Sequence, residues 1–363
     1  MRPFFSCNFL ASVVPWIIVK MGADVLSAKR KGSKPKSSKP KTTGKPKSTK
    51  SHKKSRSARR RGRISPLLLI LILIISGITG YVFTSSPDLR DSVTQFARGL
   101  IYQEEAAPMM PIDGEVIVHF IDVGQGDSVL IQTTAGSVLI DGGDNHMGER
   151  VTEYIRRAGI GDITYVVATH PHADHIGGLI EVLNQFPVGA LIMPPVAHTT
   201  VTFEWFLDAI ENNDVPLREP IAGDSFVVGD ATFTIIAPNS TGHGNLNDYS
   251  VSLRVAHGMN AFIFTGDAYT FSELEMIASG HNLAANVLHL GHHGSSTSTS
   301  QEFLDAVRPD IAVISVAANN SYGHPHNTVM SRLRVAGVRI YRTDFHGNVA
   351  IVSDGANLVV YHD

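Results

Sequence analysis

Three histidines and one aspartate fall within six residues of the segment 169–178, which reads THPHADHIGG. Imidazole nitrogens and carboxylate oxygens are ligands that suit zinc, manganese or iron. If the backbone alternates, His170 and His172 face one ion, while Asp174 and His175 point to a second ion a few ångströms away, as in two-metal hydrolytic sites. The competing interpretation is a polar loop that is rich in histidine, but metal-type ligands rarely cluster in this way by composition alone.

The residues around this cluster predict the elements that hold it. Residues 163–168 are apolar and β-branched and predict a buried strand, and residues 177–183 predict the start of a helix. The cluster therefore lies on a strand-to-helix loop, where a rigid scaffold can fix its side chains. Strand-like and helix-like stretches alternate through residues 115–363. This alternation fits a layered α/β fold, an αββα sandwich with metals at the edge of a sheet.

Aspartates beside glycines follow predicted strands at three further places. They occur in the turn DVGQGD, at Asp141 in LIDGG, and at Asp267 after the strand 261–265. An aspartate in such a place is often only a turn former or a helix cap. Asp122 and Asp127, at the two ends of DVGQGD, stay ambiguous between that role and a role in a site.

Two more histidine pairs occur later in the chain. His292 and His293 follow a predicted strand at 286–290, and neighbouring side chains diverge if the strand continues. We expect His293 to bind metal and His292 to be a donor near the site, although the sequence leaves the reverse open. We expect His324 to act at the site, whereas His326 is balanced between a substrate contact and the first turn of a helix.

These motifs closely resemble the metallo-β-lactamase superfamily, and more narrowly the C-terminal hydrolase domain of ComEC-type competence proteins. The resemblance covers about residues 115–361 and rests on five motifs in order: DVGQGD, THPHADHIGG, FTGD, HHGS and YGHPH. It implies an αββα sandwich of the metallo-β-lactamase type that binds two divalent ions, zinc or manganese. It also implies hydrolysis of phosphodiesters, with DNA as one of them.

The resemblance, together with the patterns above, assigns roles to individual residues. The candidate metal ligands are His170, His172, Asp174, His175, Asp267, His293 and Asp248. The candidate catalytic residues are Asp174, His292 and His324. Asp141 would support the site from behind the ligands, and the candidate substrate contacts are Tyr322 and His326.

One position departs from the wider superfamily, which usually supplies a further histidine between the cluster and the bridging Asp267. Residues 245–250 offer Asn247 or Asp248 there, and His243 is a less favoured substitute. The first metal would then be held weakly, or only one metal would be held tightly. The metal identity stays open for the same reason.

Charge is divided sharply along the chain. Residues 29–63 hold 17 Lys plus Arg and no acid, whereas residues 85–363 hold 12 Arg, no Lys and 32 Asp plus Glu. Residues 64–84 are uncharged and apolar, and about 20 residues of helix reach roughly 30 Å, which spans a bilayer core. The positive-inside rule then places the N-terminal side in the cytoplasm and the hydrolase domain outside the cell, as a single-pass protein of the cell membrane.

The predicted organisation therefore has four parts: an N-terminal segment with a disordered Lys/Pro-rich tract at 1–63, a membrane helix at 64–84, a linker at 85–114, and the hydrolase domain at 115–363. The basic tract would set the topology, or bind anionic lipid or nucleic acid.

The N-terminal residues and the single cysteine add little more. Residues 1–20 read either as a short signal-like segment or as an overextended start, with Met21 as the initiator. The only cysteine is Cys7, so no intramolecular disulfide can form. The oligomeric state has no signal in the sequence.

The function that fits best is a membrane-anchored, metal-dependent phosphodiesterase or nuclease-like hydrolase. The acidic balance of the hydrolase domain argues against a dedicated DNA-uptake nuclease, because nonspecific DNA affinity comes mainly from Lys and Arg. Two other classes stay open. One is an extracellular hydrolase of a small ester, a phosphocholine headgroup or a lactam. The other is a non-enzymatic, membrane-anchored module whose basic tail binds a polyanion.

Overall fold

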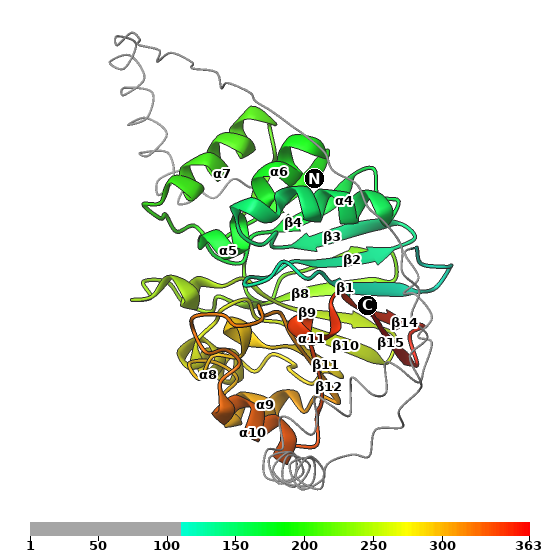
Figure 1. Cartoon of the computed structure of the whole chain (residues 1–363), viewed down its shortest axis with the longest axis vertical. Helices are drawn as coiled ribbons and strands as arrows, with labels where there is room; N and C mark the ends of the chain where they lie inside the picture. Colours follow the sequence, from blue (N-terminus) through cyan, green and yellow to red (C-terminus); the bar gives the residue numbers. More distant parts are fainter. Residues whose placement is uncertain (1–109) are drawn as a thin grey trace, which may run out of the picture. The chain divides into compact units, whose positions relative to one another are not determined.

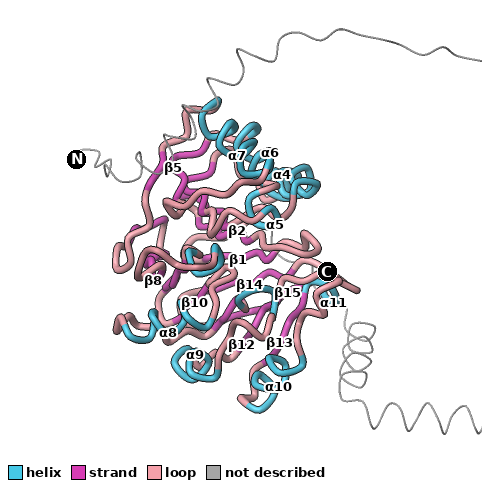
Figure 2. Tube along the Cα trace, turned by 90° about the vertical axis from the view of Figure 1, so that its left-hand side faces the viewer, coloured by secondary structure: helices cyan, strands magenta, loops and turns pink. Residues whose placement is uncertain are grey.

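Two β-sheets lie face to face, with helices on both outer faces, in the computed structural model, which describes residues 110–363 (Figure 1). The turned view in Figure 2 shows the same four layers, with α4, α6 and α7 above the sheets and α8, α9 and α10 below them. This is the αββα sandwich that the alternating sequence pattern predicted.

The first sheet has eight strands and carries the histidine-rich loop. In order across the sheet they are β15 (Leu358–His362), β14 (Val349–Ser353), β1 (Val116–Phe120), β2 (Val129–Thr133), β3 (Gly136–Ile140), β4 (Ile163–Val167), β5 (Val188–Ile192) and β6 (Leu217–Arg218). Neighbours from β15 to β3 pair antiparallel, and those from β3 to β6 pair parallel. The carboxyl ends of β3 and β4 therefore open at the same edge of the sheet.

The second sheet has seven strands. In order they are β13 (Arg339–Arg342), β12 (Ile311–Ile314), β11 (Val287–His289), β10 (Asn260–Phe264), β9 (Ser252–His257), β8 (Ala231–Ala237) and β7 (Ser225–Val228). From β10 to β13 the strands are parallel, and from β10 to β7 they are antiparallel. The loops that follow β10 and β11 thus leave the sheet at one common edge.

Helices cover the outer face of each sheet. Those that pack on the first sheet are α4 (Gly148–Arg157), α5 (Ala173–Ile176), α6 (Leu179–Gln185) and α7 (Val201–Asn212). Those that pack on the second are α8 (Thr270–Ala278), α9 (Gln301–Val307) and α10 (Asn327–Val335). A short α11 (Thr343–His346) links β13 to β14, and the 3₁₀ turns are η1 (Asn145–Met147), η2 (Leu246–Tyr249) and η3 (Gly291–Gly294).

The core is layered in the same way. Phe120, Phe233, Phe262 and Phe264 are among the fully buried side chains between the two sheets. Separate apolar layers fill the space under each set of helices. Burial of one large apolar side chain contributes about 1.5–3 kcal/mol, so these layers hold the sheet edges as a stiff frame for the loops that leave them.

The helix predicted to start at residues 177–183 is α6, which begins at Leu179, and a further short helix precedes it. A helical turn begins at Ala173, inside the cluster, and the chain then breaks before α6. Two glycines between these helices pack closely: a Cβ on Gly178 would lie 1.9 Å from the carbonyl oxygen of Gly142, and one on Gly177 would lie 2.3 Å from the amide nitrogen of Asn145. The cluster is thereby pressed against the turn that follows β3.

Several predictions concern residues outside the described part of the chain. The N-terminal segment at 1–63, the membrane helix at 64–84 and nearly all of the linker at 85–114 belong to it. Within residues 110–363, no helix combines the length and apolarity that crossing a membrane needs.

A buried histidine makes the stability of the domain depend on pH. His119 in β1 lies under α4, with its Nδ1 3.1 Å from the hydroxyl of Tyr154. Burial lowers the pKa of His119 from 6.5 to about 4. The unfolded chain therefore takes up a proton near pH 6.5 and the folded domain only near pH 4. This part of the stability is complete above about pH 6.5 and is lost toward pH 4, at about 1.4 kcal/mol per pH unit.

We predict that the free energy of unfolding, measured by urea titration between about pH 7 and pH 4, falls less steeply in His119→Gln than in the unmodified protein. The glutamine keeps a polar group beside Tyr154 but cannot titrate. Parallel curves for the two proteins would show that His119 is not neutral in the fold.

Candidate metal centre

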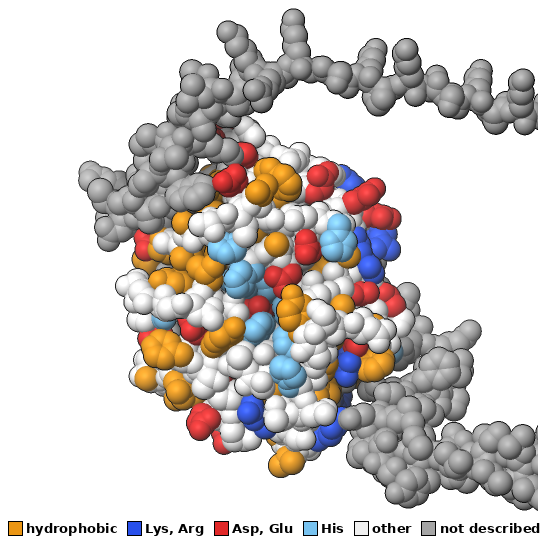
Figure 3. Space-filling model, turned by 60° about the vertical axis from the view of Figure 1, so that its left-hand side comes forward, with side chains coloured by type: hydrophobic (Ala, Val, Ile, Leu, Met, Phe, Trp, Pro, Cys, Tyr) orange, Lys and Arg blue, Asp and Glu red, His pale blue; other side chains and the backbone are white. Residues whose placement is uncertain are grey.

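Loops from both sheets meet at the edge where the parallel strands end. The first sheet contributes the turn after β3 and the histidine loop after β4, and the second contributes the loops after β10 and β11. Figure 3 shows histidine side chains gathered with carboxylates in a hollow on this face of the domain. The predicted cluster and the distant predicted aspartate and histidines are thus brought together.

One group of potential ligands consists of His170, His172 and Asp267, whose ligand atoms all lie within 4.8 Å of one another. His170 Nε2 is 2.9 Å from His172 Nδ1 and 3.8 Å from Asp267 Oδ2. The two rings therefore turn nitrogens toward the same point, as the spacing of the two histidines predicted.

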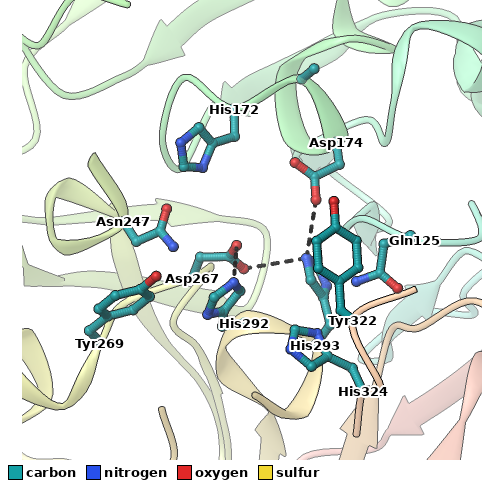
Figure 4. Close-up of a pocket in the computed structure, with 11 residues that line it drawn as sticks. Gln125, His172, Asp174, Asn247, Asp267, Tyr269, His292, His293, Tyr322 and His324 are labelled. Carbon is teal, nitrogen blue, oxygen red and sulfur yellow. Dashed lines mark ion pairs between the residues drawn. The ribbon is translucent and has the colours of Figure 1, made fainter. Parts of the chain in front are cut away.

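A second group consists of Asp174, His175 and His293. His293 Nε2 lies 3.4 Å from Asp174 Oδ2, and His175 Nε2 lies 3.9 Å from the same oxygen. Asp267 also reaches this group, since its carboxylate oxygens are 3.3 Å from His175 Nε2 and 3.6 Å from His293 Nε2. Asp267 therefore lies between the two groups, where a carboxylate shared by two ions would have to be (Figure 4).

The chemistry of these groups fits divalent cations. His175 Nε2, His293 Nε2 and Asp267 Oδ1 are buried and have no hydrogen-bond partner in the described part of the chain. A buried polar atom without a partner is costly, so convergent lone pairs of this kind favour a bound ion. Nitrogen and carboxylate donors without sulfur suit zinc, manganese or iron. The histidine and aspartate clusters could therefore hold divalent metal.

The electrostatics agree with a site that attracts positive charge. Burial opposes the charged form of His175, but the carboxylates of Asp267 and Asp141 outweigh it and hold the pKa of His175 well above its usual range. Burial would also raise the pKa of Asp267, yet His175 and His293 hold it well below its usual range. Burial lowers the pKa of His170, which keeps that ring in the neutral form that binds metal.

Asp141 contacts Nδ1 of His175, the ring nitrogen that does not face the ligand groups. Its Oδ2 accepts hydrogen bonds from His175 Nδ1 at 2.8 Å and from the Thr169 hydroxyl at 2.7 Å, and its Oδ1 accepts the Thr169 amide at 2.8 Å. The contact fixes the ring so that Nε2 faces the centre. This is the contact that a supporting aspartate behind the ligands requires.

The loop after β11 carries His292 and His293 without the side-chain alternation of a continued strand. The strand ends at His289, and both residues then take left-handed backbone conformations, with φ of 51° and 53°. Because the strand does not continue, the rings do not alternate across it, and both reach the cavity. His293 is buried, with Nδ1 3.1 Å from the carbonyl oxygen of Ser315. His292 stacks on Tyr269, with its Nε2 3.7 Å from Asp267 Oδ2.

The predicted ligand Asp248 lies elsewhere. Its Oδ1 accepts the backbone amide of Tyr269, at 3.3 Å, where α8 begins, and it is not among the side chains gathered at the centre. Its neighbour Asn247 lines the cavity instead, with a buried Oδ1 that has no partner among the described residues. The alternative residue His243 lies 4.0 Å from Glu275, away from the cavity. A 3₁₀ turn at η2 decides which of these neighbours faces inward.

The predicted site residues in the loop before α10 do not all reach the cavity. His324 and Tyr322 line the cavity, and their rings stack with centroids 5.6 Å apart. His326 does not line it; its Nδ1 accepts the backbone amide of Ser296 at 2.8 Å, and α10 begins directly after it. For His326 the geometry favours the helix start over the substrate contact.

These side chains enclose a cavity of about 370 Å³ above the two ligand groups. Its lining residues are Gln125, His172, Ala173, Asp174, Asn247, Asp267, Tyr269, His292, His293, Tyr322 and His324. None of these described residues is Lys or Arg. Gln125 and Tyr269 were missed from the sequence, although their positions inside DVGQGD and two residues after Asp267 could have indicated them.

A family model described as the Metallo-beta-lactamase superfamily matches residues 121–318. The chain is 32% identical over 260 residues to ComE operon protein 3 of Bacillus subtilis (strain 168), which is 67% of this chain and 33% of that protein. It is 29% identical over 291 residues to Competence protein ComA of Neisseria gonorrhoeae, which is 78% of this chain and 38% of that protein.

The chain thus spans about a third of the length of these curated relatives. Among solved structures, CmlA, a diiron beta-hydroxylase from Streptomyces venezuelae, aligns with a TM-score of 0.44 and 14% identity, over 66% of this chain and 54% of that chain.

We predict that Asp267→Asn lowers the amount of divalent metal bound per chain, because the carboxylate between the two ligand groups loses its charge. Hydrolytic activity should fall by more than the roughly 10–100-fold that is typical of outer-shell changes. Metal content by mass spectrometry and thermal unfolding would be measured together. Asp248→Asn is the matched control, since it removes a nearby carboxylate that lies outside the centre. Unchanged metal content with lost stability would give Asp267 a structural role only.

We also predict different effects for the two adjacent histidines. His293→Ala should lower the metal stoichiometry, and added metal should restore part of the activity, because a buried ligand is missing. His292→Ala should keep the metals and lose rate by roughly 10²–10⁴-fold, as for a lost general acid or base, without rescue by metal. The opposite pattern would exchange the two roles, and two silent substitutions would remove both residues from the site.

Proposed function

Because the chain belongs to the metallo-beta-lactamase superfamily and is a metal-dependent hydrolase, we propose that it hydrolyses phosphodiesters of low charge. The observation that carries this proposal is the position of Asp267, shared between two ligand groups at the base of an open cavity. A two-ion arrangement is suited to in-line displacement at phosphorus, where both the attacking and the leaving oxygen need stabilisation. Resemblance to ComEC-type competence proteins also supports phosphodiesters.

Six side chains would hold two divalent ions, zinc or manganese. His170 and His172 would serve the first ion, Asp174, His175 and His293 the second, and Asp267 both. When bound, the ions would polarise the scissile group and lower the pKa of an attacking water. Asn247 is the further donor that the geometry favours for the first ion, because it lines the cavity and its buried Oδ1 has no hydrogen-bond partner among the described residues.

His292 is placed to move a proton at Nε2. Its Nδ1 lies 2.8 Å from the hydroxyl of Thr297, and that hydroxyl donates to Ser295 at 3.0 Å. The Thr297 oxygen can therefore accept Nδ1–H, which leaves the Nε2 lone pair directed at the cavity. Burial lowers the pKa of His292, so the ring is neutral near pH 7. We propose that Nε2 accepts a proton that the hydrolytic water releases and delivers it to the leaving oxygen, so that the leaving group departs as an alcohol.

His324 and the two tyrosines would bind the substrate. Burial and the neighbouring imidazoles lower the pKa of His324 to about 4, so it acts as a neutral hydrogen-bond donor near pH 7. Tyr269 stacks on His292 and Tyr322 stacks on His324, and all four residues line the cavity. Planar or apolar groups on each side of a phosphodiester could pack there.

A second candidate function is hydrolysis of a small ester, a phosphocholine headgroup or a lactam. It is favoured by one observation: no Lys or Arg is among the described residues that line the cavity. The same observation limits any nucleic acid substrate to a short contact, because extended phosphate backbones are bound mainly by Lys and Arg.

We further propose that residues 64–84 anchor the enzyme in the cell membrane, with its N-terminus in the cytoplasm and the hydrolase domain outside. This part rests on the sequence alone: an uncharged apolar segment follows a tract of 17 Lys plus Arg. The tract would then meet anionic lipid or nucleic acid on the cytoplasmic side.

We predict that the purified full-length chain hydrolyses a chromogenic phosphodiester in the presence of zinc or manganese, and that a chelator abolishes this. Between 50 and 200 mM salt its rate should change by less than about threefold, whereas a binder that makes 6–10 phosphate contacts loses roughly 10³–10⁵ in affinity. The panel would include single- and double-stranded DNA, a β-lactam and a phosphocholine ester. Lactam or ester hydrolysis without phosphodiester hydrolysis would replace the proposal with the second candidate.

A further inference from the structure

Asp127 is a buried carboxylate that the proposed mechanism does not use. It ends the turn DVGQGD between β1 and β2, only 2% of its surface is exposed, and it does not line the cavity. Its Oδ1 lies 3.2 Å from His293 Nδ1 and 3.7 Å from His289 Nε2. Those imidazole nitrogens are its nearest counter-charges, yet Oδ1 accepts no well-directed hydrogen bond from any described residue.

The backbone of the same turn is tied to the histidine loop. The amide of Asp127 donates to the carbonyl oxygen of Asp174 at 3.2 Å, and the carbonyl oxygen of Asp127 accepts the amide of Gly143 at 2.8 Å. Gly126, with φ of 131°, makes this approach possible, because a Cβ there would lie 2.2 Å from the Asp174 carbonyl oxygen. The turn therefore contacts two members of the second ligand group, Asp174 through its backbone and His293 through its carboxylate.

His293 needs a partner behind it. A ligand histidine usually donates its other ring N–H to a carboxylate or a carbonyl, which fixes the tautomer and makes the ligand nitrogen more basic. His175 has such a partner in Asp141, at 2.8 Å. His293 has the carbonyl oxygen of Ser315 at 3.1 Å on Nδ1, and Asp127 lies almost as close to the same nitrogen. The two buried ligand histidines are thus backed by two buried aspartates from two different turns.

We propose that Asp127 is a positioning residue that orients His293 through Nδ1 and strengthens binding of the second metal ion. Its oxygen also lies within 4.8 Å of ligand atoms of Asp267 and His293. Asp127 does not line the cavity, whereas Asp174, Asp267 and His293 do, so its charge would act on the ion through the imidazole rather than by direct ligation. The inference rests on the proposed metal centre but not on any particular substrate. A buried anion at this point is offset only when positive charge is present nearby, which a bound divalent ion supplies.

The competing explanation is purely structural. In that case Asp127 would serve only its contact with His289, whose Nε2 also lies 2.8 Å from the hydroxyl of Ser315. Removing the charge would then change the stability of the metal-free protein and leave metal affinity as it was. The two explanations therefore differ in a quantity that can be measured without any substrate.

The test uses the full-length chain and the variant Asp127→Asn, with Asp122→Asn as the matched control from the other end of the same turn. Asp122 accepts the amide of Gly124 at 3.0 Å and pairs with Arg150 at 3.3 Å, away from the cavity. Zinc and manganese affinities would be measured by competition with a chromophoric chelator, and the metal-free proteins would be compared by thermal unfolding. We expect Asp127→Asn to bind two ions, with affinity for one of them weaker by roughly 10–100-fold. Asp122→Asn should match the unmodified protein.

Three results would overturn the inference. They are unchanged affinity in Asp127→Asn, an equal loss in the control, and a stoichiometry of one ion at saturating metal, which would make Asp127 a direct ligand. If Asp127→Asn does not fold, Asp127→Glu takes its place, since it keeps the charge but displaces it. Weaker affinity in that variant supports the inference, and failure of both variants to fold overturns it. An unmodified protein that binds no metal would instead refute the proposed function itself.

Discussion

A single carboxylate, Asp267, is buried among imidazole rings, and the rest of the site is arranged around its charge. Only 2% of its surface is exposed, and nitrogens of His175, His293, His292 and His170 lie 3.3–3.8 Å from its oxygens. An ionised carboxylate is costly to remove from water unless positive charge surrounds it. The rings partly offset this charge. Among the described residues the Nε2 atoms of His175 and His293 have no hydrogen-bond partner, so a divalent ion bound by them could offset the rest.

Such a cluster can persist only on a rigid frame, because its members come from loops that are distant in sequence. The parallel strands β3, β4, β10 and β11 end at a common edge of the sandwich, and the phenylalanine-rich layer between the sheets fixes their relative positions. Glycines then allow the loops to approach closely. Gly126 fits against the carbonyl of Asp174, and Gly178 fits against that of Gly142, where no larger residue would fit. Packing thus holds the loops after β3, β4, β10 and β11 in fixed positions, so that their side chains form one preorganised site.

The surroundings of the site narrow its chemistry. Residues 85–363 contain no Lys, and neither Lys nor Arg is found among the described residues that line the cavity. Negative charge on a substrate would therefore be met by bound ions and by neutral histidines. Two stacked pairs, Tyr269 with His292 and Tyr322 with His324, line the cavity and add aromatic surface to it. This combination suits a small or locally bound substrate better than an extended polyanion.

The sequence alone determined the elements and the ligand chemistry, because both are local. Apolar runs marked β4, β10 and β11, and the spacing of His170, His172, Asp174 and His175 indicated two groups of metal ligands. The tertiary structure decided which loop side chains face the cavity. A 3₁₀ turn directs Asn247 inward and leaves Asp248 at the start of α8, and left-handed backbone at His292 and His293 brings both rings to the cavity.

The same distinction explains why the sequence did not assign Asp127, Gln125 or Tyr269 to the site. Asp127, for example, contacts His293, which lies more than a hundred residues further along the chain. A hydrophobic pattern with a period of two or 3.6 residues reports which side of an element is buried, but it carries no information about an irregular loop. The direction of a loop side chain is set by backbone angles that distant contacts impose. The sequence therefore indicated the kind of site and most of its candidate ligands, and the packing of the two sheets decided which other loop residues reach it.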